Sequence, residues 1–412
     1  MTLSHLKSAT SVAVHHPSRL LRADIQLPAS KSESNRALII AALCQQACEL
    51  TNLAEARDTV TMQRLLGSPD LMLDVLDAGT TMRFLAAWCV ATHRQAVLTG
   101  SARMKERPIS VLVDALRELG ATIDYLENEG YPPIKIQRFE LARNQVAIRG
   151  DVSSQYISAL LMVAPVLPGG LTLKLVGRVA SRPYIEMTLQ LMENFGVGHT
   201  WQDNTIQIAE QPYTASTYAV ESDWSAASYW FSMVALAEEA EVRLLGLKSA
   251  SLQGDREIVK IMAHLGVKTT FEAGGILLTK IPAEPALEWD FSHCPDLAQT
   301  IAVVGAAKGI GLKMKGLESL RIKETDRTAA LQAELARFGI ATEAIGDTEL
   351  HVAPGGIHPS GELVRTYKDH RMAMAFAPLG LLFGIEIERP EVVDKSYPRF
   401  WSDLAQAGFE IH

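Results

Sequence analysis

The sequence has little of what marks disulfide-rich, nucleic-acid-coating or membrane proteins. Only 4 cysteines occur in 412 residues, without CxxC or CxxH spacing, which excludes a disulfide framework and favours a reducing, cytoplasmic compartment. The formal charge of −8 excludes nucleic-acid binding driven by bulk charge. The longest apolar runs, residues 159–167 and 373–385, are broken or bounded by proline and glycine and are too short to span a membrane. A chain of 412 residues then predicts two or three globular domains, at about 150 residues each.

What the sequence does contain is an internal repeat. An amphipathic helix that ends in an apolar-Gly-apolar stop recurs at steps of 69 to 76 residues. Each glycine stands where a helix ends in a left-handed residue, and the apolar residues after it predict entry into a strand. The glycines are Gly120, Gly196, Gly266, Gly339 and Gly408.

A second series runs in phase with the first. A short turn of Ser, Thr or Asp opens an Ala-rich, almost wholly apolar helix, at steps of 70 to 74 residues. The anchors are Gly79, Ser153, Asp223, Asp296 and Asp369, and PASKSESNRALIIAALC begins a sixth, shorter copy that ends near Gly67. One unit cannot enclose its own apolar helix, so six units must pack with helices inward and sheets outward. The alternative, an ordinary doubly wound α/β protein, has a pattern that recurs at shorter intervals.

The polar turns carry cations at predicted helix starts. A helix start already favours anions through its free N–H groups and dipole, and Ser, Lys and Arg add donors and full charge. Taken singly, Ser153 and Ser154 are explained as N-caps, and Arg83 and Arg371 as surface cations. Taken together, these cations gather beside Gly, Ser and Thr although the chain as a whole is acidic. This clustering predicts a small substrate with several negative charges.

Two acidic residues lie within these turns. In RIKETDR, helical spacing predicts that Lys323 and Arg327 share a face, with Glu324 one residue round the turn. Glu324 either balances the charge of its cationic neighbours in an ion pair or carries a proton. Asp296 opens an apolar helix, where an N-cap role is sufficient. The sequence has no HExxH, no phosphate-binding glycine loop and no GxSxG motif, and we expect no metal and no cofactor.

The motifs together resemble the 5-enolpyruvylshikimate-3-phosphate (EPSP) synthase family. The resemblance runs from about residue 21 to the C-terminus, through LPASKSESNRALIIAAL, DAGTTMR, RMKERPI, VSSQY, SRPYI, PDLAQTIA, RIKETDR, KDHRMAMAF and DKSYP. It implies a two-domain inside-out α/β barrel of six βαβαββ repeats, three per domain, with helices inside and sheets outside. Residues 1–28 with 223–412 would form one discontinuous domain and residues 29–222 the other, with the active-site cleft between them.

The resemblance also implies an activity. The family transfers the enolpyruvyl group of phosphoenolpyruvate to the 5-hydroxyl of shikimate 3-phosphate, with release of phosphate, by addition and elimination through a tetrahedral intermediate. The expected enzyme is therefore a transferase of the shikimate pathway, the target of glyphosate, which needs no metal or cofactor. We expect a cytoplasmic monomer whose partners are its two small substrates, with no nucleic acid and no membrane.

Site residues follow from the resemblance, motif by motif. For catalysis they are Asp296, which takes the proton from the 5-hydroxyl, Glu324, which protonates the methylene carbon, Lys31 and Lys323. For shikimate 3-phosphate they are Lys31, Ser32, Arg36, Ser153, Ser154, Gln155, Ser181, Arg182, Tyr184, Asp296, Ser319 and Lys323. For phosphoenolpyruvate they are Lys31, Gly79, Arg107, Gln155, Arg327, Arg371 and Lys395.

Three positions depart from the usual pattern of the family. Asp77 stands where Asn is frequent, Phe84 where many members have Pro, and Ser319 where some have Asn. Asp77 places a negative charge near the expected phosphoenolpyruvate site. These departures bear on substrate affinity and on sensitivity to glyphosate, and they leave the expected reaction unchanged.

Three other functions remain as alternatives. The sister enzyme that acts on UDP-N-acetylglucosamine typically uses a Cys in the loop that corresponds to residues 101–107, where this chain has none. RNA 3′-phosphate cyclase shares the repeat unit but needs a nucleotide-accepting His and a path for RNA. A non-enzymatic scaffold for polyanions has no use for Asp296 and Glu324 among its cations.

Overall fold

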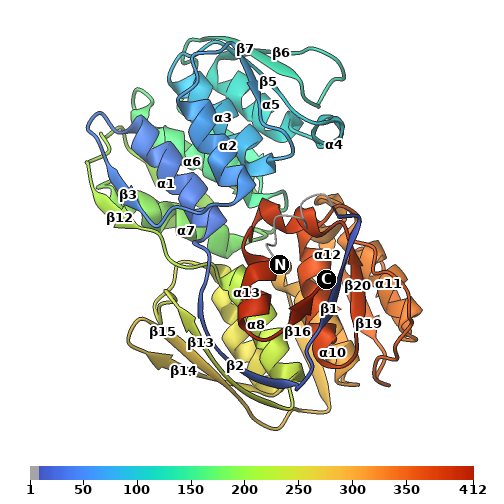
Figure 1. Cartoon of the computed structure of the whole chain (residues 1–412). Coiled ribbons are helices and arrows are strands. Elements are labelled where there is room, and N and C mark those ends of the chain that lie inside the picture. Colours follow the sequence, from blue (N-terminus) through green and yellow to red (C-terminus); the bar gives the residue numbers. More distant parts are fainter. Residues whose placement is uncertain (1–8) are drawn as a thin grey trace. The chain divides into compact units, whose positions relative to one another are not determined.

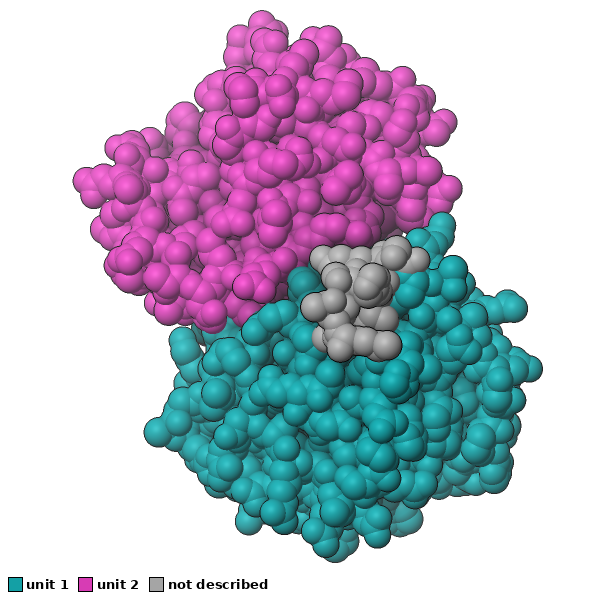
Figure 2. Space-filling view, viewed as in Figure 1, with its two compact units in different colours: residues 1–28, 221–412 teal, residues 29–220 magenta. Residues whose placement is uncertain are grey.

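The computed structural model describes residues 9–412 and divides the chain into two compact units. Unit 1 consists of residues 1–28 and 221–412, and unit 2 of residues 29–220 (Figure 2). The return to unit 1 lies two residues before the boundary expected at 222/223.

Unit 2 contains three sheets, whose strand orders are β4-β5-β7-β6, β10-β11-β9-β8 and β12-β3. Its strands are β3 Glu49–Thr51, β4 Met72–Asp74, β5 Ala96–Thr99, β6 Ala121–Tyr125, β7 Ile134–Phe139, β8 Gln145–Arg149, β9 Leu171–Val176, β10 Thr200–Gln202, β11 Thr205–Ile208 and β12 Thr217–Ala219. Its helices are α1 Lys31–Leu43, α2 Arg57–Leu66, α3 Gly79–Ala91, α4 Ala102–Lys105, α5 Ser110–Leu119, α6 Ser154–Val163 and α7 Arg182–Asn194.

Unit 1 also contains three sheets, with strand orders β14-β15-β13-β2, β16-β17-β19-β18 and β20-β1-β21. Its strands are β1 Ser11–His15, β2 Leu20–Gln26, β13 Glu239–Leu245, β14 Val267–Glu272, β15 Gly275–Lys280, β16 Ala286–Asp290, β17 Gly311–Lys315, β18 Thr342–Ile345, β19 Glu349–Val352, β20 Ile385–Glu388 and β21 Glu410–Ile411. Its α-helices are α8 Trp224–Leu236, α9 Ile258–His264, α10 Ala298–Ala307, α11 Arg327–Arg337, α12 His370–Phe376 and α13 Phe400–Gln406 (Figure 1).

The order of elements repeats the βαβαββ pattern in both units. In unit 2 it is complete in β8-α6-β9-α7-β10-β11 and in β4-α3-β5-α5-β6-β7. In unit 1 it is complete in β16-α10-β17-α11-β18-β19, and β2 supplies the first strand to the repeat of α8, since it pairs with β13 in parallel. The unit of α1 and α2 is shorter, with only β12 and β3, as the early stop near Gly67 predicts.

The two repeated sequence signals correspond to two kinds of helix. All five stop glycines have a left-handed φ, between 81° and 114°. At Gly120 a Cβ atom would lie 1.9 Å from the carbonyl oxygen of Glu140, so only glycine fits. The Ala-rich helices α3, α6, α8, α10 and α12 are buried almost throughout.

Helices lie inside each unit and sheets outside. Strands such as β2 and β8 alternate buried and exposed residues, so one face of each sheet packs on helices and the other meets solvent. In unit 1 the buried helices α8, α10 and α12 pack against one another. Within residues 9–412, no helix combines the length and the apolar composition needed to cross a bilayer.

Candidate active site

In unit 1 the carboxylate of Asp296 lies between two arginines. Its Oδ1 lies 2.9 Å from Nη1 of Arg327, and its Oδ2 lies 2.7 Å from Nη2 of Arg371. Asp296 belongs to a 3₁₀ turn, Pro295–Leu297, and makes no capping bond to α10, whose N-cap position is Leu297. The N-cap explanation of Asp296 is therefore wrong, and the residue is part of a charged cluster.

Arg327 is the centre of this cluster. Its guanidinium is buried and donates to three carboxylates, through Nε to Asp369 at 2.7 Å, Nη1 to Asp296 at 2.9 Å and Nη2 to Glu324 at 3.0 Å. The helical spacing expected for RIKETDR is wrong, because α11 begins only at Arg327 and Lys323 follows the 3₁₀ turn Glu318–Ile322 with ψ −152°. The extended backbone at Lys323 still lets its Nζ lie 4.0 Å from Oδ1 of Asp296.

The remaining cations of the cluster, Arg371 and Lys395, come from the last repeat, that of α12. Arg371, in the first turn of α12, also donates to the hydroxyl of Tyr229 at 3.3 Å and to the hydroxyl of Ser225 at 3.3 Å. Buried Lys395 places Nζ 3.2 Å from Oε1 of Glu324. Arg371 is 6% exposed, so its explanation as a surface cation is wrong.

The cluster shifts the pKa values of Asp296 and Arg327. Burial alone would raise the pKa of Asp296, but Arg371, Lys323 and Arg327 outweigh it and hold that pKa far below its ordinary value. Burial would lower the pKa of Arg327, and Asp369, Glu324 and Asp296 together raise it instead. Asp255 lies behind the cluster, where burial and the charge of Asp296 raise its pKa to about 7. Carboxylates thus balance the cations of the cluster. Groups whose pKa values are shifted by such neighbours are typical of sites that transfer protons.

Unit 2 holds a different charge arrangement at the start of α3. Arg83 is 4% exposed, and no carboxylate among the described residues pairs with it. Its guanidinium donates to the carbonyl oxygens of Gly79 at 2.9 Å and Pro108 at 3.1 Å. A Cβ at Gly79 would lie 2.6 Å from Nη1 of Arg83 and 2.7 Å from Nη1 of Arg107, so both guanidinium groups converge on this glycine. A buried cation without a carboxylate is costly, which makes the start of α3 a candidate site for an anion.

Arg36 is a second buried cation of unit 2. Its guanidinium donates to the hydroxyls of Thr188 and Ser158 and to the carbonyl oxygens of Ser32 and Tyr184, at 2.7 to 3.4 Å. Burial lowers its pKa to about 10. These bonds occupy four of the five N–H groups, and no carboxylate within residues 9–412 pairs with Arg36. Lys31, at the start of the same helix, lies 3.3 Å from the buried carboxylate of Asp58.

The serine turns begin α6 and α7. Ser153 caps α6 by accepting from the N–H of Gln155, whose side chain donates to Thr80 of α3 at 3.1 Å. Ser181 precedes α7 with φ 52°, a strained left-handed backbone for serine. The guanidinium of Arg182 bonds Glu186 and lies 4.2 Å over the ring of Trp201. Ser319 lies in the 3₁₀ turn that precedes Lys323.

Sequence reasoning missed three charged residues that hold these groups in place. They are Asp369, which binds Arg327, Asp58, which binds Lys31, and Arg83, which the sequence placed among the cations at helix starts but not among the site residues. A signal existed for Arg83, since it is the only charged residue of an otherwise apolar helix and such a position is buried.

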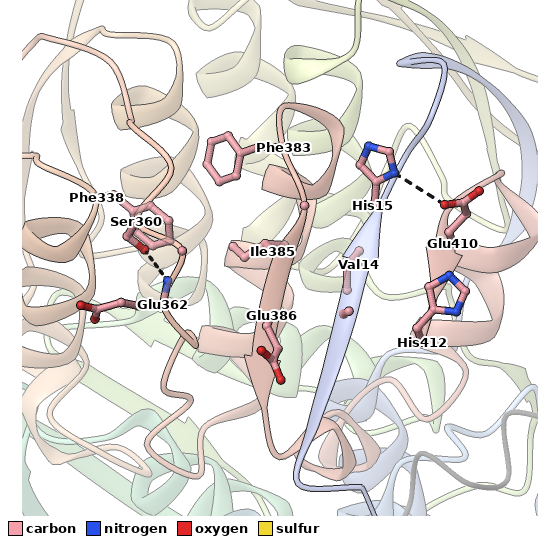
Figure 3. Close-up of a pocket in the computed structure, with 13 residues that line it drawn as sticks. Val14, His15, Phe338, Ser360, Glu362, Phe383, Ile385, Glu386, Glu410 and His412 are labelled. Atoms are coloured by element: carbon pink, nitrogen blue, oxygen red, sulfur yellow. Dashed lines mark hydrogen bonds and ion pairs between the residues drawn. The ribbon is translucent and has the colours of Figure 1, made fainter.

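The cavity drawn in Figure 3 lies elsewhere in unit 1 and holds none of the predicted site residues. It measures about 220 Å³ and is lined by Val14, Phe338, Phe383 and Ile385, with Glu362, Glu386 and Glu410 around them. Carboxylates without lysine or arginine do not suit phosphorylated acids.

Among residues 9–412, no group of His, Cys, Asp and Glu is arranged to hold a metal ion.

Comparison with known proteins finds relatives that match nearly the whole chain. The family model described as EPSP synthase (3-phosphoshikimate 1-carboxyvinyltransferase) matches residues 15–68 and 63–404. The chain belongs to the EPSP synthase family. Curated 3-phosphoshikimate 1-carboxyvinyltransferases of Bacteroides fragilis and Vibrio cholerae (strain M66-2) are 47% and 36% identical to it. Each match covers 95% of this chain, with 96% and 98% of those relatives.

The structural comparison agrees. An EPSP synthase of Acinetobacter baumannii superposes with a TM-score of 0.79 at 22% identity, over 98% of this chain and 100% of that one. The expected family, the inside-out α/β fold and the enolpyruvyl transfer of the shikimate pathway are confirmed. Transfer to UDP-N-acetylglucosamine and a non-enzymatic scaffold are not favoured by these matches.

Proposed function

We propose that the two units divide the work of the transfer from phosphoenolpyruvate to shikimate 3-phosphate. Unit 2 supplies buried Arg83 and Arg36, which pair with no carboxylate among the described residues, and unit 1 supplies carboxylates held among cations. The observation that carries the proposal is buried Arg83, which converges with Arg107 on Gly79 and has no carboxylate of its own. The substrates carry a phosphate and a carboxylate each, which is the chemistry such cations bind.

In unit 2 the start of α3 receives phosphoenolpyruvate. Gly79 leaves room above the helix start, and Arg107, with Arg83 as an addition to the expected set, supplies paired N–H donors. Lys31 and Gln155 are the other residues of unit 2 that bind phosphoenolpyruvate. Ser153, Ser154 and Ser181 bind the phosphate of shikimate 3-phosphate. Arg36 binds its carboxylate, and Ser32 and Tyr184 line its ring. Arg182 also binds the phosphate of shikimate 3-phosphate, which requires its side chain to leave Glu186.

In unit 1 Glu324 protonates the methylene carbon of phosphoenolpyruvate, and Asp296 accepts the proton of the 5-hydroxyl. The resulting tetrahedral intermediate then loses phosphate and a proton. Arg327, Arg371 and Lys395 bind phosphoenolpyruvate, while Lys323 and Ser319 orient the other substrate and the intermediate. The strongly lowered pKa of Asp296 makes it a weak base until anionic substrate draws Arg327 and Arg371 from it.

Phosphate release tests the reaction. We expect phosphate from phosphoenolpyruvate only when shikimate 3-phosphate is also present, because addition must precede elimination. The protein is assayed with phosphoenolpyruvate alone, with shikimate 3-phosphate added and with UDP-N-acetylglucosamine added. Release that needs UDP-N-acetylglucosamine, or no release at all, contradicts the proposal.

Gly79→Ala tests the anion site of unit 2. The new Cβ would lie 2.6 to 2.8 Å from the ends of Arg83 and Arg107, so both groups must shift, and long side chains can do so without unfolding the helix. We expect the KM for phosphoenolpyruvate to rise about tenfold, equivalent to the loss of one charge-assisted hydrogen bond. Steady-state kinetics measure it, with Gly67→Ala as control, since a Cβ at Gly67 meets nothing closer than 3.8 Å. Equal KM values in both variants would remove Gly79 from the site.

The expected cytoplasmic location and monomeric state remain parts of this proposal. The four cysteines are free thiols, in agreement with a reducing compartment. Sedimentation of the purified protein would give its oligomeric state.

A further inference from the structure

Asp77 places a negative charge two residues before Gly79, beside the start of α3. Two consecutive peptide units separate their Cα atoms by at most about 7 Å. A carboxylate at this distance repels a phosphate or carboxylate bound at Gly79, and it opposes the positive end of the helix that favours such a ligand. Left alone, Asp77 would weaken the anion site that Arg83 and Arg107 form.

The structure pairs this carboxylate with Arg57. Nη2 of Arg57 lies 3.1 Å from Oδ1 and 2.9 Å from Oδ2 of Asp77. The pair is partly exposed, with 44% of the Arg57 side chain and 34% of the Asp77 side chain accessible. The charge of Asp77 is thus compensated at the point where it would oppose an anion.

The backbone around Arg57 is fixed with respect to α3. Arg57 is the first residue of α2, and the hydroxyl of Thr81 in α3 donates to the carbonyl oxygen of Asp58 at 3.2 Å. Asp58, the next residue, holds Lys31 at the start of α1. The first turn of α2 therefore contacts residues at or next to the starts of two neighbouring helices, α1 and α3.

We propose that Arg57 is a positioning residue for phosphoenolpyruvate, which acts by compensating and orienting Asp77 beside the anion site. The inference rests on the assignment of phosphoenolpyruvate to Gly79 and Arg107. It extends that assignment to a residue that contacts no substrate. The simple alternative is an exposed ion pair with no effect on binding, as most such pairs are.

A double-mutant cycle distinguishes a positioning role of Arg57 from an ion pair with no effect on binding. We expect Arg57→Gln to raise the KM for phosphoenolpyruvate about tenfold, because the carboxylate of Asp77 then loses the positive charge of Arg57 beside the anion site. The KM for shikimate 3-phosphate and kcat should stay within about twofold, since the effect is local and electrostatic. Asp77→Asn in the same chain should restore the KM, because no charge remains to compensate.

Controls distinguish charge from a general loss of structure. Arg143→Gln, which breaks an exposed pair with Glu118 of the same unit at 2.9 Å, should leave every constant unchanged. In 1 M salt, where the Debye length is about 3 Å, the effect of Arg57→Gln should shrink.

Two outcomes would overturn the inference. One is an unchanged KM in Arg57→Gln while Gly79→Ala raises it, which leaves the phosphoenolpyruvate site intact and removes Arg57. The other is a double variant as impaired as Arg57→Gln alone, which means that Arg57 does not act through Asp77. If neither Arg57→Gln nor Gly79→Ala changes the KM, the assignment of phosphoenolpyruvate to this helix start fails as well.

Discussion

Glu324→Gln is expected to lower kcat by about 10²- to 10⁴-fold, the usual contribution of a general acid or base. The carboxylate of Glu324 accepts from Nη2 of Arg327 at 3.0 Å and lies 3.2 Å from Nζ of Lys395. An amide has the same shape and keeps one acceptor oxygen, so it retains the contact with one of these two cations, but the amide cannot deliver a proton to carbon. KM values should therefore change much less than kcat.

Single-turnover and steady-state kinetics measure this loss. Glu318→Gln is the matched control, because Glu318 is exposed in the same segment and has no assigned role. A kcat for Glu324→Gln equal to that of the unchanged protein would take the proton transfer away from this residue. Binding of both substrates with unchanged affinity, measured by calorimetry, would show that the loss lies in the chemical step.

The repeats were predictable because they are local. A helix that ends at a left-handed glycine and a wholly apolar helix each leave a signal within a few residues, and the two series gave six units and their inside-out packing. The shortened unit of α1 was visible in the early stop near Gly67. The contribution of β2 to the sheet of β13 was not visible, since the two strands are separated by all of unit 2.

The pairing of charges was not predictable from one sequence. Asp296, Glu324 and Asp369 meet at Arg327 because two repeats of unit 1 bring the starts of α10, α11 and α12 together, and spacing along the chain carries no record of that. The spacing within RIKETDR was even misleading, because the backbone at Lys323 is extended rather than helical. Motif resemblance found Asp296 and Glu324, and only the packing identified Asp369 as the third carboxylate that binds Arg327 and Arg57 as the partner of Asp77.

Arg327→Met is expected to destabilise unit 1 by about 3–5 kcal/mol at pH 7, the usual result of removing one partner from a buried ionic cluster. The carboxylates of Asp296, Glu324 and Asp369 would remain together without the guanidinium that all three contact. Methionine fills a similar volume, so lost packing contributes little. Arg321→Met is the control, because Arg321 forms half-exposed pairs with Asp326 and Asp347 that contribute at most about 1 kcal/mol.

The destabilisation should depend on pH in a defined direction. In the unchanged protein the pKa of Asp296 is far below that of an unfolded aspartate, about 3.9, so its stabilisation is complete above that pH and is lost only as the pH falls below it. Without Arg327 the folded pKa rises, and protonation at pH 4–5 relieves the repulsion among the carboxylates. The deficit of the variant should therefore shrink between pH 7 and pH 4. Urea unfolding followed by tryptophan fluorescence measures it, since buried Trp224 and Trp230 report on unit 1. A deficit that grows on acidification, or one no larger than that of Arg321→Met, would mean that Arg327 does not hold the three carboxylates together.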